Sequence, residues 1–388
     1  MEATAKILVV DDDWRNRDLM SAFLEPLGLD VLMAENGPAA LKACLLEKPD
    51  LVLLDVMMPG MDGFEVARRL RGNPETFELP VVMVTALNQV GDRVAALEAG
   101  ADDFLTKPVD RTELKARVLS LLKIKVYRDQ INLNQARVAQ ELALASNLQK
   151  GLLPRRENLA RLARRHGLAI SYGVRPAGEV CGDFLDVQRL EQGVVAVTLA
   201  DCKGHGVSAG MMTMAVHALL HSLPDLGAQA GENLTLLAKN LSGVLPSRQF
   251  AAAAHFIYDP RSAVLSLARA GLPGPIFGHA DPQSIREPGV AGAPPLGLVK
   301  GNTPIGQREF QMAEGDRLVL YTDGFSEAEE KNGGFFGIPS QKLLTLCRRH
   351  WELPLEEFKS ALLTEWEQRQ GAGERDDCSL VVVERLAG

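Results

Sequence analysis

Aspartates stand directly after short apolar runs in the first third of the chain. Asp11 and Asp12 follow one run and Asp55 follows another, while Lys107 follows a third. Three carboxylates that meet cannot all stay ionised without a cation, and an all-oxygen site selects a hard ion such as magnesium. A lysine on the opposite side would neutralise the oxygens of an incoming phosphoryl group. These residue types predict a carboxylate that accepts a phosphoryl group.

A second set of aspartates, each in a glycine-rich context, lies between residues 183 and 376. Its members are Asp183, Asp201, Asp323 and Asp376. Carboxylates at strand ends, with glycines that let carbonyl groups and waters approach, suit two octahedral hard cations. Two such metals can generate hydroxide from a bridging water and clamp a phosphoryl group for in-line attack. The set predicts hydrolysis of phosphate esters, although Asp-Gly turns are also common in β-rich domains.

Strands and helices that could position the first set alternate over residues 1–122. The expected strands are Lys6–Val10, Asp30–Met33, Leu51–Leu54, Val81–Val84 and Asp103–Leu105. The expected helices are Arg15–Leu27, Pro38–Leu46, Phe64–Arg71, Arg93–Ala99 and Arg111–Leu122. This alternation predicts a parallel sheet with helices on both faces, and ligands of such sheets bind at the carboxyl ends of the strands.

The residues at these strand ends resemble the receiver domain of two-component response regulators. The matching motifs are Val9-Val10-Asp11-Asp12-Asp13, Asp55-Val56-Met57-Met58-Pro59-Gly60-Met61-Asp62-Gly63, Thr85-Ala86, Gly100-Ala101-Asp102-Asp103-Phe104 and Lys107-Pro108. The resemblance covers residues 5–122 without a gap and implies an α/β flavodoxin-like fold. Aspartates at strand ends are ordinary turn formers and helix caps, but that explanation does not account for five residue types at five matching ends.

The resemblance implies a role for each residue of this group. The implied set consists of the phospho-acceptor Asp55, the magnesium ligands Asp11, Asp12, Asp55 and the carbonyl of Met57, the phosphoryl contacts Thr85 and Lys107, and the aromatic switch Phe104. The Lys107-Pro108 bond is expected to be cis, which an X-Pro bond permits at low cost. The implied phosphoryl donor is a histidine kinase or a phosphotransfer protein.

Residues 123–164 are expected to form a helical linker. Apolar or small residues recur every seven positions, at Ile124, Ile131, Val138, Ala145 and Leu152. This spacing predicts one seam of a coiled coil and a parallel homodimer, although the second seam is interrupted by polar residues such as Asn134. A single helix packed on a neighbouring domain is the alternative.

Residues 165–388 are expected to form an α+β domain with two packed β-sheets flanked by helices. The expected strands are Ala169–Val174, Val194–Ala200, Ala251–Tyr258, Ala263–Ala268, Arg317–Tyr321 and Ser379–Glu384. The expected helices are Ser208–Ser222, Asn233–Leu245 and Leu355–Arg369. The segment from Gly271 to Gly306 is rich in Gly and Pro and is expected to form loops around the edge of a sheet.

The second domain resembles the metal-dependent, protein phosphatase 2C-like (PPM-type) serine/threonine phosphatases of the stage II sporulation protein E subclass. The motifs include Cys181-Gly182-Asp183-Phe184-Leu185-Asp186, Asp201-Cys202-Lys203-Gly204-His205-Gly206, Tyr321-Thr322-Asp323-Gly324, Phe325-Ser326-Glu327-Ala328, Arg375-Asp376-Asp377-Cys378-Ser379 and, at the end of the linker, Leu148-Gln149 with Leu152-Leu153-Pro154. The resemblance implies that two manganese or magnesium ions are held by Asp183, Asp201, Asp323, Asp376 and the carbonyl of Cys202, with Asp186 and Asp377 supporting these ligands.

Three positions depart from the subclass pattern, at Cys181, Leu272 and Cys378-Ser379, but none removes a carboxylate. His217 and His221 lie one helical turn apart and could form a metal pair. No Glu follows His217, so the zinc-protease pattern fails, and a buried, hydrogen-bonded pair is the simpler interpretation.

Composition restricts the partners and the compartment. The net charge of −8 argues against a nucleic-acid partner, which usually faces a basic surface. Five cysteines without a C-x-x-C pair favour a reducing cytoplasm, and the N-terminus lacks the long apolar run of a secretory signal. The least charged stretch, Gly204 to Pro224, contains His, Ser and Gly residues that favour a buried helix over a membrane span.

The resemblances imply a response regulator whose Asp55 phosphorylation controls a protein serine/threonine phosphatase. The implied substrate is a phosphorylated anti-sigma-factor antagonist of a partner-switching pathway. The alternative is a phosphatase-like adaptor that has lost catalysis and is gated by receiver phosphorylation. Retention of all four aspartates favours the enzyme, because an adaptor has no need of costly clustered charges.

Overall fold

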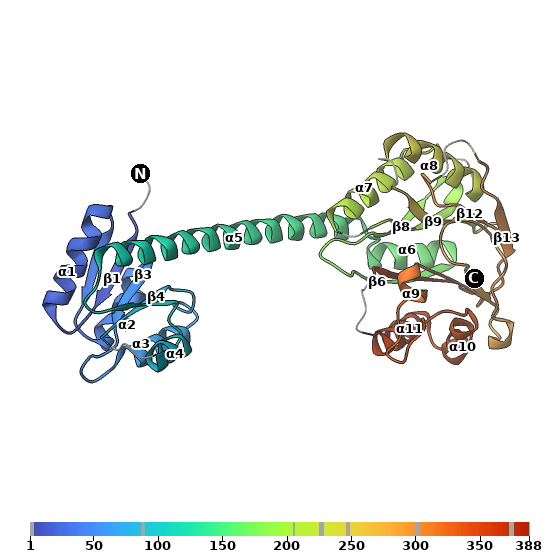
Figure 1. Cartoon of the computed structure of the whole chain (residues 1–388). Helices are drawn as coiled ribbons and strands as arrows, with labels where there is room; N and C mark the ends of the chain where they lie inside the picture. The colour runs from blue at the N-terminus through green and yellow to red at the C-terminus, as the bar shows by residue number, and fades with distance from the viewer. Residues whose placement is uncertain are drawn as a thin grey trace. The chain divides into compact units, whose positions relative to one another are not determined.

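Figure 1 shows the computed structural model of the chain, which describes residues 4–86, 90–204, 206–224, 229–245, 249–298, 303–371 and 376–387. His205 and Arg375, which belong to two of the motifs quoted above, lie outside the described residues. The chain divides into two compact units, Met1–Arg137 and Val138–Gly388. This boundary falls inside the segment that was expected to be a linker.

The first unit is built on five parallel strands. They are β1 (Lys6–Val10), β2 (Asp30–Ala34), β3 (Leu51–Asp55), β4 (Val81–Thr85) and β5 (Asp103–Thr106). Their order in the sheet is β2-β1-β3-β4-β5, and every neighbouring pair is parallel. This is the flavodoxin-like order, so the predicted fold of this domain is confirmed.

Helices cover both faces of this sheet because its central strands are apolar on both sides. The helices are α1 (Trp14–Leu24), α2 (Gly37–Glu47), α3 (Gly63–Arg71), α4 (Val90–Glu98) and the start of α5 (Arg111–Leu152). On β1, Leu8 and Val10 pack in the core with α2 and α3, whereas Ile7 and Val9 pack in the core with α1 and α5. Because both faces of such a strand are buried in an apolar core, its polar residues lie at the ends of the strand.

Helix α5 continues without a break from the first unit into the second. Its large apolar residues Ile131, Leu133 and Val138 are 53–72% exposed. Such exposure of Ile131 and Val138, two members of the heptad seam, fits a helix that pairs with a second copy. The coiled coil and the homodimer stay a prediction.

The second unit contains two antiparallel-rich sheets. The larger has the order β12-β10-β9-β8-β7, with β13 paired to β10, and the smaller has the order β11-β14-β15-β6. Their strands are β6 (Leu168–Arg175), β7 (Asp183–Arg189), β8 (Val195–Cys202), β9 (Ala251–Asp259), β10 (Val264–Ala270), β11 (Ile276–Gly278), β12 (Gly292–Ala293), β13 (Gln307–Gln311), β14 (Arg317–Tyr321) and β15 (Cys378–Arg385).

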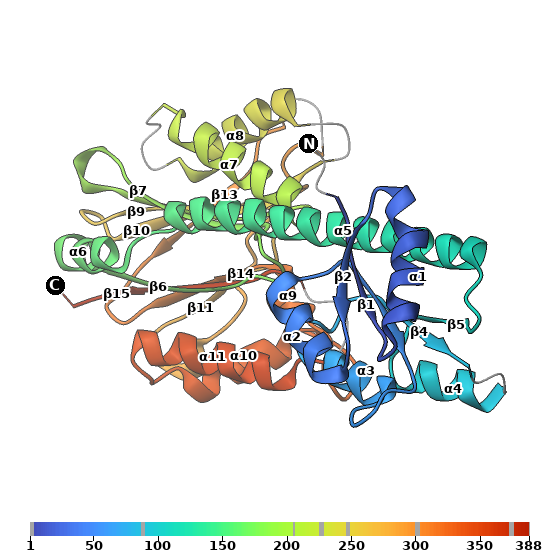
Figure 2. The same cartoon turned by 90° about the vertical axis from the view of Figure 1, so that its left-hand side faces the viewer.

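The two sheets pack face to face with helices on their outer sides, so the predicted architecture is confirmed (Figure 2). The helices are α6 (Arg156–His166), α7 (Val207–His221), α8 (Ala230–Val244), α9 (Asp323–Ser326), α10 (Gln341–His350) and α11 (Leu355–Arg369). Leu185 and Val197 of the larger sheet and Leu320 of the smaller sheet share the core between the sheets. Helices α7 and α8 cover the larger sheet, and α10 and α11 cover the smaller one.

The expected strands and helices of this unit are present, and the structure adds β7, β13, α9 and α10 to them. The described part of the segment expected to be loops, Gly271 to Gly306, contains the short strands β11 and β12 at sheet edges and a 3-10 turn at Pro282–Ser284. No helix among the described residues is both long enough and apolar enough to cross a membrane.

Candidate functional site

The receiver aspartates meet at the carboxyl ends of neighbouring strands β1 and β3. One carboxylate oxygen from each of Asp11, Asp12 and Asp55 lies within 4.8 Å of the others. Asp11 and Asp55 are buried, and Asp12 is exposed. Lys107 Nζ lies 2.8 Å from Asp11 Oδ2 and 3.0 Å from Asp55 Oδ1. The lysine thus contacts both buried carboxylates, as the sequence predicted.

At Asp55 and Lys107, burial and ion pairing shift the pKa in opposite directions. Burial raises the pKa of Asp55, and the ion pair with Lys107 only partly offsets it. Burial lowers the pKa of Lys107, but its bonds to Asp11 and Asp55 outweigh that effect and leave the pKa raised. Lys107 is therefore held as a cation beside the carboxylates, where it can meet a negatively charged group.

The remaining receiver residues lie near this cluster in the sheet. Thr85 is buried at the end of β4, which pairs with β3, and Phe104 lies half-buried on β5. The Lys107-Pro108 bond is cis, as expected. Met57 follows Asp55 by two residues, in the loop after β3. The donor set of carboxylate and carbonyl oxygens fits a magnesium ion.

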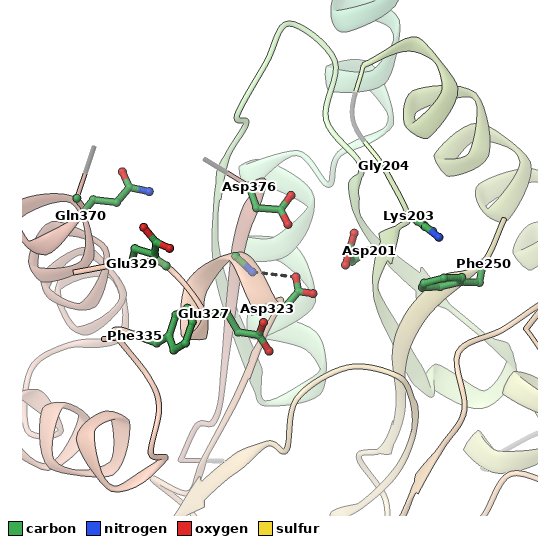
Figure 3. Close-up of a pocket in the computed structure, with 13 residues that line it drawn as sticks. Asp201, Lys203, Gly204, Phe250, Asp323, Glu327, Glu329, Phe335, Gln370 and Asp376 are labelled. Carbon is green, nitrogen blue, oxygen red and sulfur yellow. Dashed lines mark hydrogen bonds between the residues drawn. The ribbon is translucent and has the colours of Figure 1, made fainter. Parts of the chain in front are cut away.

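In the second unit, an open cavity of about 490 Å³ is lined by three of the four predicted aspartates. Asp201 ends β8, Asp323 begins α9, and Asp376 lies just before β15. Figure 3 shows the three side chains around the same space, with the Gly324 N–H donating to Asp323 Oδ1 at 2.9 Å. Segments far apart in the sequence thus bring their carboxylates to one cavity.

Asp183 is buried and does not line this cavity. It begins β7 directly opposite Asp201 of β8. Its Oδ2 accepts a hydrogen bond of 2.9 Å from Thr322 Oγ1, but its Oδ1 is buried without a hydrogen-bond partner among the described residues. A buried carboxylate oxygen without a partner is costly unless a cation binds it.

Electrostatics at these aspartates also favour a cation. Burial, followed by the charge of Asp201, raises the pKa of Asp183 well above its ordinary value. Burial, followed by the charges of Asp323 and Asp376, raises the pKa of Asp201 to about 7. The four carboxylates are more widely spread than the receiver group, since no three of them lie within 4.8 Å among the described residues. The all-oxygen donor set fits hard divalent ions.

Two glycines allow the close backbone packing around these aspartates. A Cβ at Gly182 would lie 2.9 Å from the carbonyl oxygen of Cys202, and a Cβ at Gly324 would lie 2.0 Å from that of Asp377. The buried Asp377 carboxylate accepts from the N–H groups of Ala177, at 2.7 Å, and of Gly182. Asp377 therefore holds the backbone next to Asp183, consistent with the supporting position expected of it.

Asp186, the other expected support, lies elsewhere. Asp186 is three residues from Asp183 in β7. Because side chains alternate between the two faces of a strand, this odd spacing places the two carboxylates on opposite faces. Its carboxylate faces α7, where His221 Nε2 lies 3.2 Å from Oδ2, whereas Asp183 contacts Thr322 after β14. Asp186 is thus not placed beside the cavity carboxylates.

Sequence reasoning did not assign a role to two residues that line the cavity, Lys203 and Glu327. Lys203 is the one lysine or arginine among the described lining residues, and its Nζ lies 4.9 Å from the centre of the Phe250 ring. Burial and the charges of Asp323 and Asp376 raise the pKa of Glu327. Both residues lie inside motifs that the sequence analysis recognised. The signal that could have pointed to Lys203 is that it is a basic residue beside a predicted metal-binding aspartate.

The C-terminal part of α5 contacts the strand that carries Asp183. The Gln149 side chain is buried, with Oε1 accepting from the Cys181 N–H at 2.9 Å. Gln149 Nε2 donates to the Cys181 carbonyl and, at 2.9 Å, to Thr213 Oγ1 of α7. One side chain of the helix thus bonds to both the approach to β7 and helix α7.

Comparison with known proteins agrees with this architecture. The family described as "Stage II sporulation protein E (SpoIIE)" matches residues 191–386, and "Response regulator receiver domain" matches residues 7–119. The chain belongs to the stage II sporulation protein E family. It carries a receiver domain ahead of the region that this family covers.

Curated relatives of this chain match about a third of its length. Response regulator PleD of Caulobacter vibrioides is 49% identical over 133 residues, which are 34% of this chain and 29% of PleD. The dual master transcriptional regulator RpaA of Synechocystis is 45% identical over 118 residues, which are 30% of this chain and 49% of RpaA. The chain therefore spans less than half the length of either relative.

Solved structures match the second unit. The SiaA-PP2C domain of Pseudomonas aeruginosa has a TM-score of 0.56 and 25% identity, over 66% of this chain and 99% of that domain. The RsbU and RsbW domains of a Mycobacterium tuberculosis protein have a TM-score of 0.50 and 24% identity, over 57% of this chain and 60% of theirs. The second likeness shows the fold alone. This SpoIIE-family chain therefore joins a receiver to a PP2C-like phosphatase fold.

Proposed function

We propose that this protein is a response regulator whose phosphorylation at Asp55 controls a metal-dependent protein serine/threonine phosphatase. The observation that carries the proposal is the cavity lined by Asp201, Asp323 and Asp376. On the strand opposite Asp201, Asp183 has a buried Oδ1 with no hydrogen-bond partner in the described part of the chain. Clustered carboxylates at the rim of a PP2C-like fold have a chemical purpose only if they hold cations.

In the phosphatase, Asp183, Asp201, Asp323, Asp376 and the carbonyl of Cys202 would hold two manganese or magnesium ions. Bound there, the ions would supply a water of lowered pKa and charge stabilisation for the phosphoryl oxygens. Asp377 would keep the Gly182 backbone in place beside these ligands. Lys203 would attract the phosphate group of the substrate into an otherwise acidic cavity.

In the receiver, Asp55 would accept the phosphoryl group from a histidine kinase or a phosphotransfer protein. Asp11, Asp12, Asp55 and the carbonyl of Met57 would hold magnesium. The half-buried Lys107 is already placed to pair with a phosphoryl oxygen after its bonds to the carboxylates rearrange. Thr85, at the end of β4, and Phe104, on the neighbouring strand β5, would move toward the phosphorylated Asp55 and carry the change to the surface.

Helix α5 would transmit that change. It begins in the receiver and ends at Leu152, and Gln149 bonds to Cys181, two residues before Asp183. The same amide bonds to Thr213 of α7, a helix that follows the Asp201 segment. A shift of α5 would therefore act on two ligand segments at once. Pairing of two α5 helices through Ile131 and Val138 would make the active form a homodimer.

The substrate we propose is a phosphorylated anti-sigma-factor antagonist. The support is the family membership together with the shared fold of the RsbU and RsbW domains. A seryl phosphate on such a protein would reach the cavity from solvent, because the cavity is open. The protein would act in the cytoplasm, where both a kinase and this substrate are available.

The activity is tested by phosphate release from a phosphoserine protein, with manganese or with a chelator. Wild type should release phosphate only with manganese, and Asp201→Asn should lower the rate by about 100-fold or more, because a metal ligand is lost. Asp18→Asn, an exposed change on α1, is the matched control and should keep the rate. Full activity in Asp201→Asn would refute the proposed metal site, and inactivity of wild type would favour the adaptor.

A further inference from the structure

Three metal-ligating side chains lie together on the face of the larger sheet that α7 covers. Ligand atoms of Asp186, His217 and His221 all lie within 4.8 Å of one another. His221 Nε2 is 3.2 Å from Asp186 Oδ2, and His217 Nδ1 is 3.9 Å from Asp186 Oδ1. The two imidazole ring centres are 4.3 Å apart.

Local structure holds these three side chains in place. His217 and His221 are four residues apart on α7, so both project from one side of the helix. The ring of Phe184 packs edge-on against His217 with centres 5.4 Å apart. Gln188 Nε2 donates to Asp186 Oδ2 at 2.7 Å and so orients the carboxylate. A hydrogen bond to the ligating carboxylate is a common support in metal sites.

The ion pairs of this cluster leave one buried ring nitrogen without a hydrogen bond among the described residues. His217 Nδ1 is buried and has no hydrogen-bond partner among the described residues. At 3.9 Å from Asp186 Oδ1 it is too far for a hydrogen bond. Burial, followed by the charge of His221, lowers the pKa of His217, so its ring is neutral at neutral pH. A neutral ring nitrogen without a partner is free to bind a metal.

We propose that Asp186, His217 and His221 bind a transition-metal ion of the zinc class, with water at the fourth position. Zinc binds imidazole nitrogen and carboxylate oxygen at about 2.0–2.2 Å, which places tetrahedral ligand atoms roughly 3.3 Å apart. The separation of His221 Nε2 from Asp186 Oδ2, 3.2 Å, already has this spacing. One ligand atom from each of the three residues lies within 4.8 Å of the others, so the His217 ring has to move closer to complete the tetrahedron. Two imidazoles select zinc over the magnesium or manganese that all-oxygen sites prefer.

This site is distinct from the cavity that holds the catalytic aspartates. It uses the opposite face of β7, and His221 is about half exposed, which leaves a path for the ion. The ion would tie the strand that begins at Asp183 to the C-terminal end of α7. Binding to the folded state alone would raise its stability.

Zinc binding is tested by calorimetric titration of tag-free, full-length protein with zinc chloride. Excess magnesium chloride in the buffer occupies the all-oxygen sites. We expect one zinc site per chain, and His221→Gln and Asp186→Asn should each weaken zinc binding by at least about 100-fold. The matched control His279→Gln changes an exposed histidine that also pairs with an aspartate, Asp316, and should bind zinc as wild type does.

Cobalt(II) gives an independent readout. With cobalt in place of zinc, wild type should show the intense visible absorption of a tetrahedral site, and His221→Gln should lose it. Equal melting temperatures of metal-free wild type and His221→Gln show that the variant folds. Zinc binding that is unchanged in both His221→Gln and Asp186→Asn, or absent from wild type, would overturn the proposal.

Discussion

Replacing Gln149 with methionine keeps the length of the side chain and removes its amide. The variant loses the bonds from the Cys181 N–H, to the Cys181 carbonyl and to Thr213 Oγ1. The side chain is buried, so water does not replace these partners. The last turns of α5 should then lose their hydrogen bonds to Cys181 and Thr213.

The expected loss follows from the number of bonds. A buried hydrogen bond contributes about 0.5–1.5 kcal/mol net, and leaving a buried backbone group unpaired costs about 1–3 kcal/mol. Three bonds are lost and two backbone groups of Cys181 are left without that partner. We expect Gln149→Met to lower the free energy of unfolding of the second unit by about 2–4 kcal/mol.

Urea unfolding followed by tryptophan fluorescence measures this loss. Trp351 and Trp366 are buried in the second unit, whereas Trp14 is exposed in the receiver, so the signal reports mainly the second unit. With an m value of about 2–3 kcal/mol/M, the midpoint should fall by about 1 M urea. Asn147→Met, an exposed change on the same turn, is the control. Equal midpoints for the two variants would refute the role of Gln149.

Three further predictions concern the cavity, the helix and the metal-free protein. Lys203→Ala should lower kcat/KM for a phosphoprotein about 5- to 10-fold, which corresponds to about 1–1.4 kcal/mol. The control Lys239→Ala, an exposed change on α8, should leave kcat/KM unchanged. Equal kcat/KM values for the two variants would exclude a role of Lys203 in substrate binding. Changing both Ile131 and Val138 to Asp should give a monomer by light scattering, and a surviving dimer would place the interface elsewhere. Because burial and neighbouring carboxylates raise the pKa of Asp201 from 3.8 to about 7, the folded metal-free protein holds a proton that the unfolded chain releases between these values. Its melting temperature should therefore fall as the pH rises from 4 to 7, and manganese should restore it; a melting temperature that rises over this range would contradict the shift.

The receiver could be predicted almost completely because its signals are local. Apolar runs such as Leu51–Leu54 and Val81–Val84 are buried on both faces, so they read as strands without tertiary information. In a parallel sheet, the carboxyl ends of neighbouring strands lie at the same edge, so the residues that follow them are close together. This is why Asp11, Asp55 and Lys107 could be placed near one another before their distances were known.

The surroundings of Asp186 could not be predicted from the sequence, for a physical reason. Strand β7 begins at Asp183 and includes Asp186 and Gln188, so its polar residues obscure the alternation of a half-buried strand. Because this strand was not predicted, the spacing of three residues between Asp183 and Asp186 did not show that their side chains lie on opposite faces of a sheet. The contact of Asp186 with His217 and His221 arises only from the packing of α7, which no local pattern encodes.

The contacts of Gln149 were beyond sequence reasoning for a similar reason. The sequence indicated where α5 ends but not which of its side chains is buried against Cys181 and Thr213. A polar residue on a helix is usually exposed, and its burial depends on partners 32 and 64 residues away. Such long-range hydrogen bonds are fixed by the tertiary fold.

The central claim is that phosphorylation of Asp55 controls the phosphatase. The most direct measurement is the rate of manganese-dependent phosphate release from a phosphoserine protein, with and without acyl phosphate, in wild type and in Asp55→Asn. We predict that acyl phosphate changes the wild-type rate by about 5- to 150-fold, the usual range of such coupling, and leaves the rate of Asp55→Asn unchanged. A wild-type rate that ignores acyl phosphate, or an equal response in Asp55→Asn, would contradict the claim.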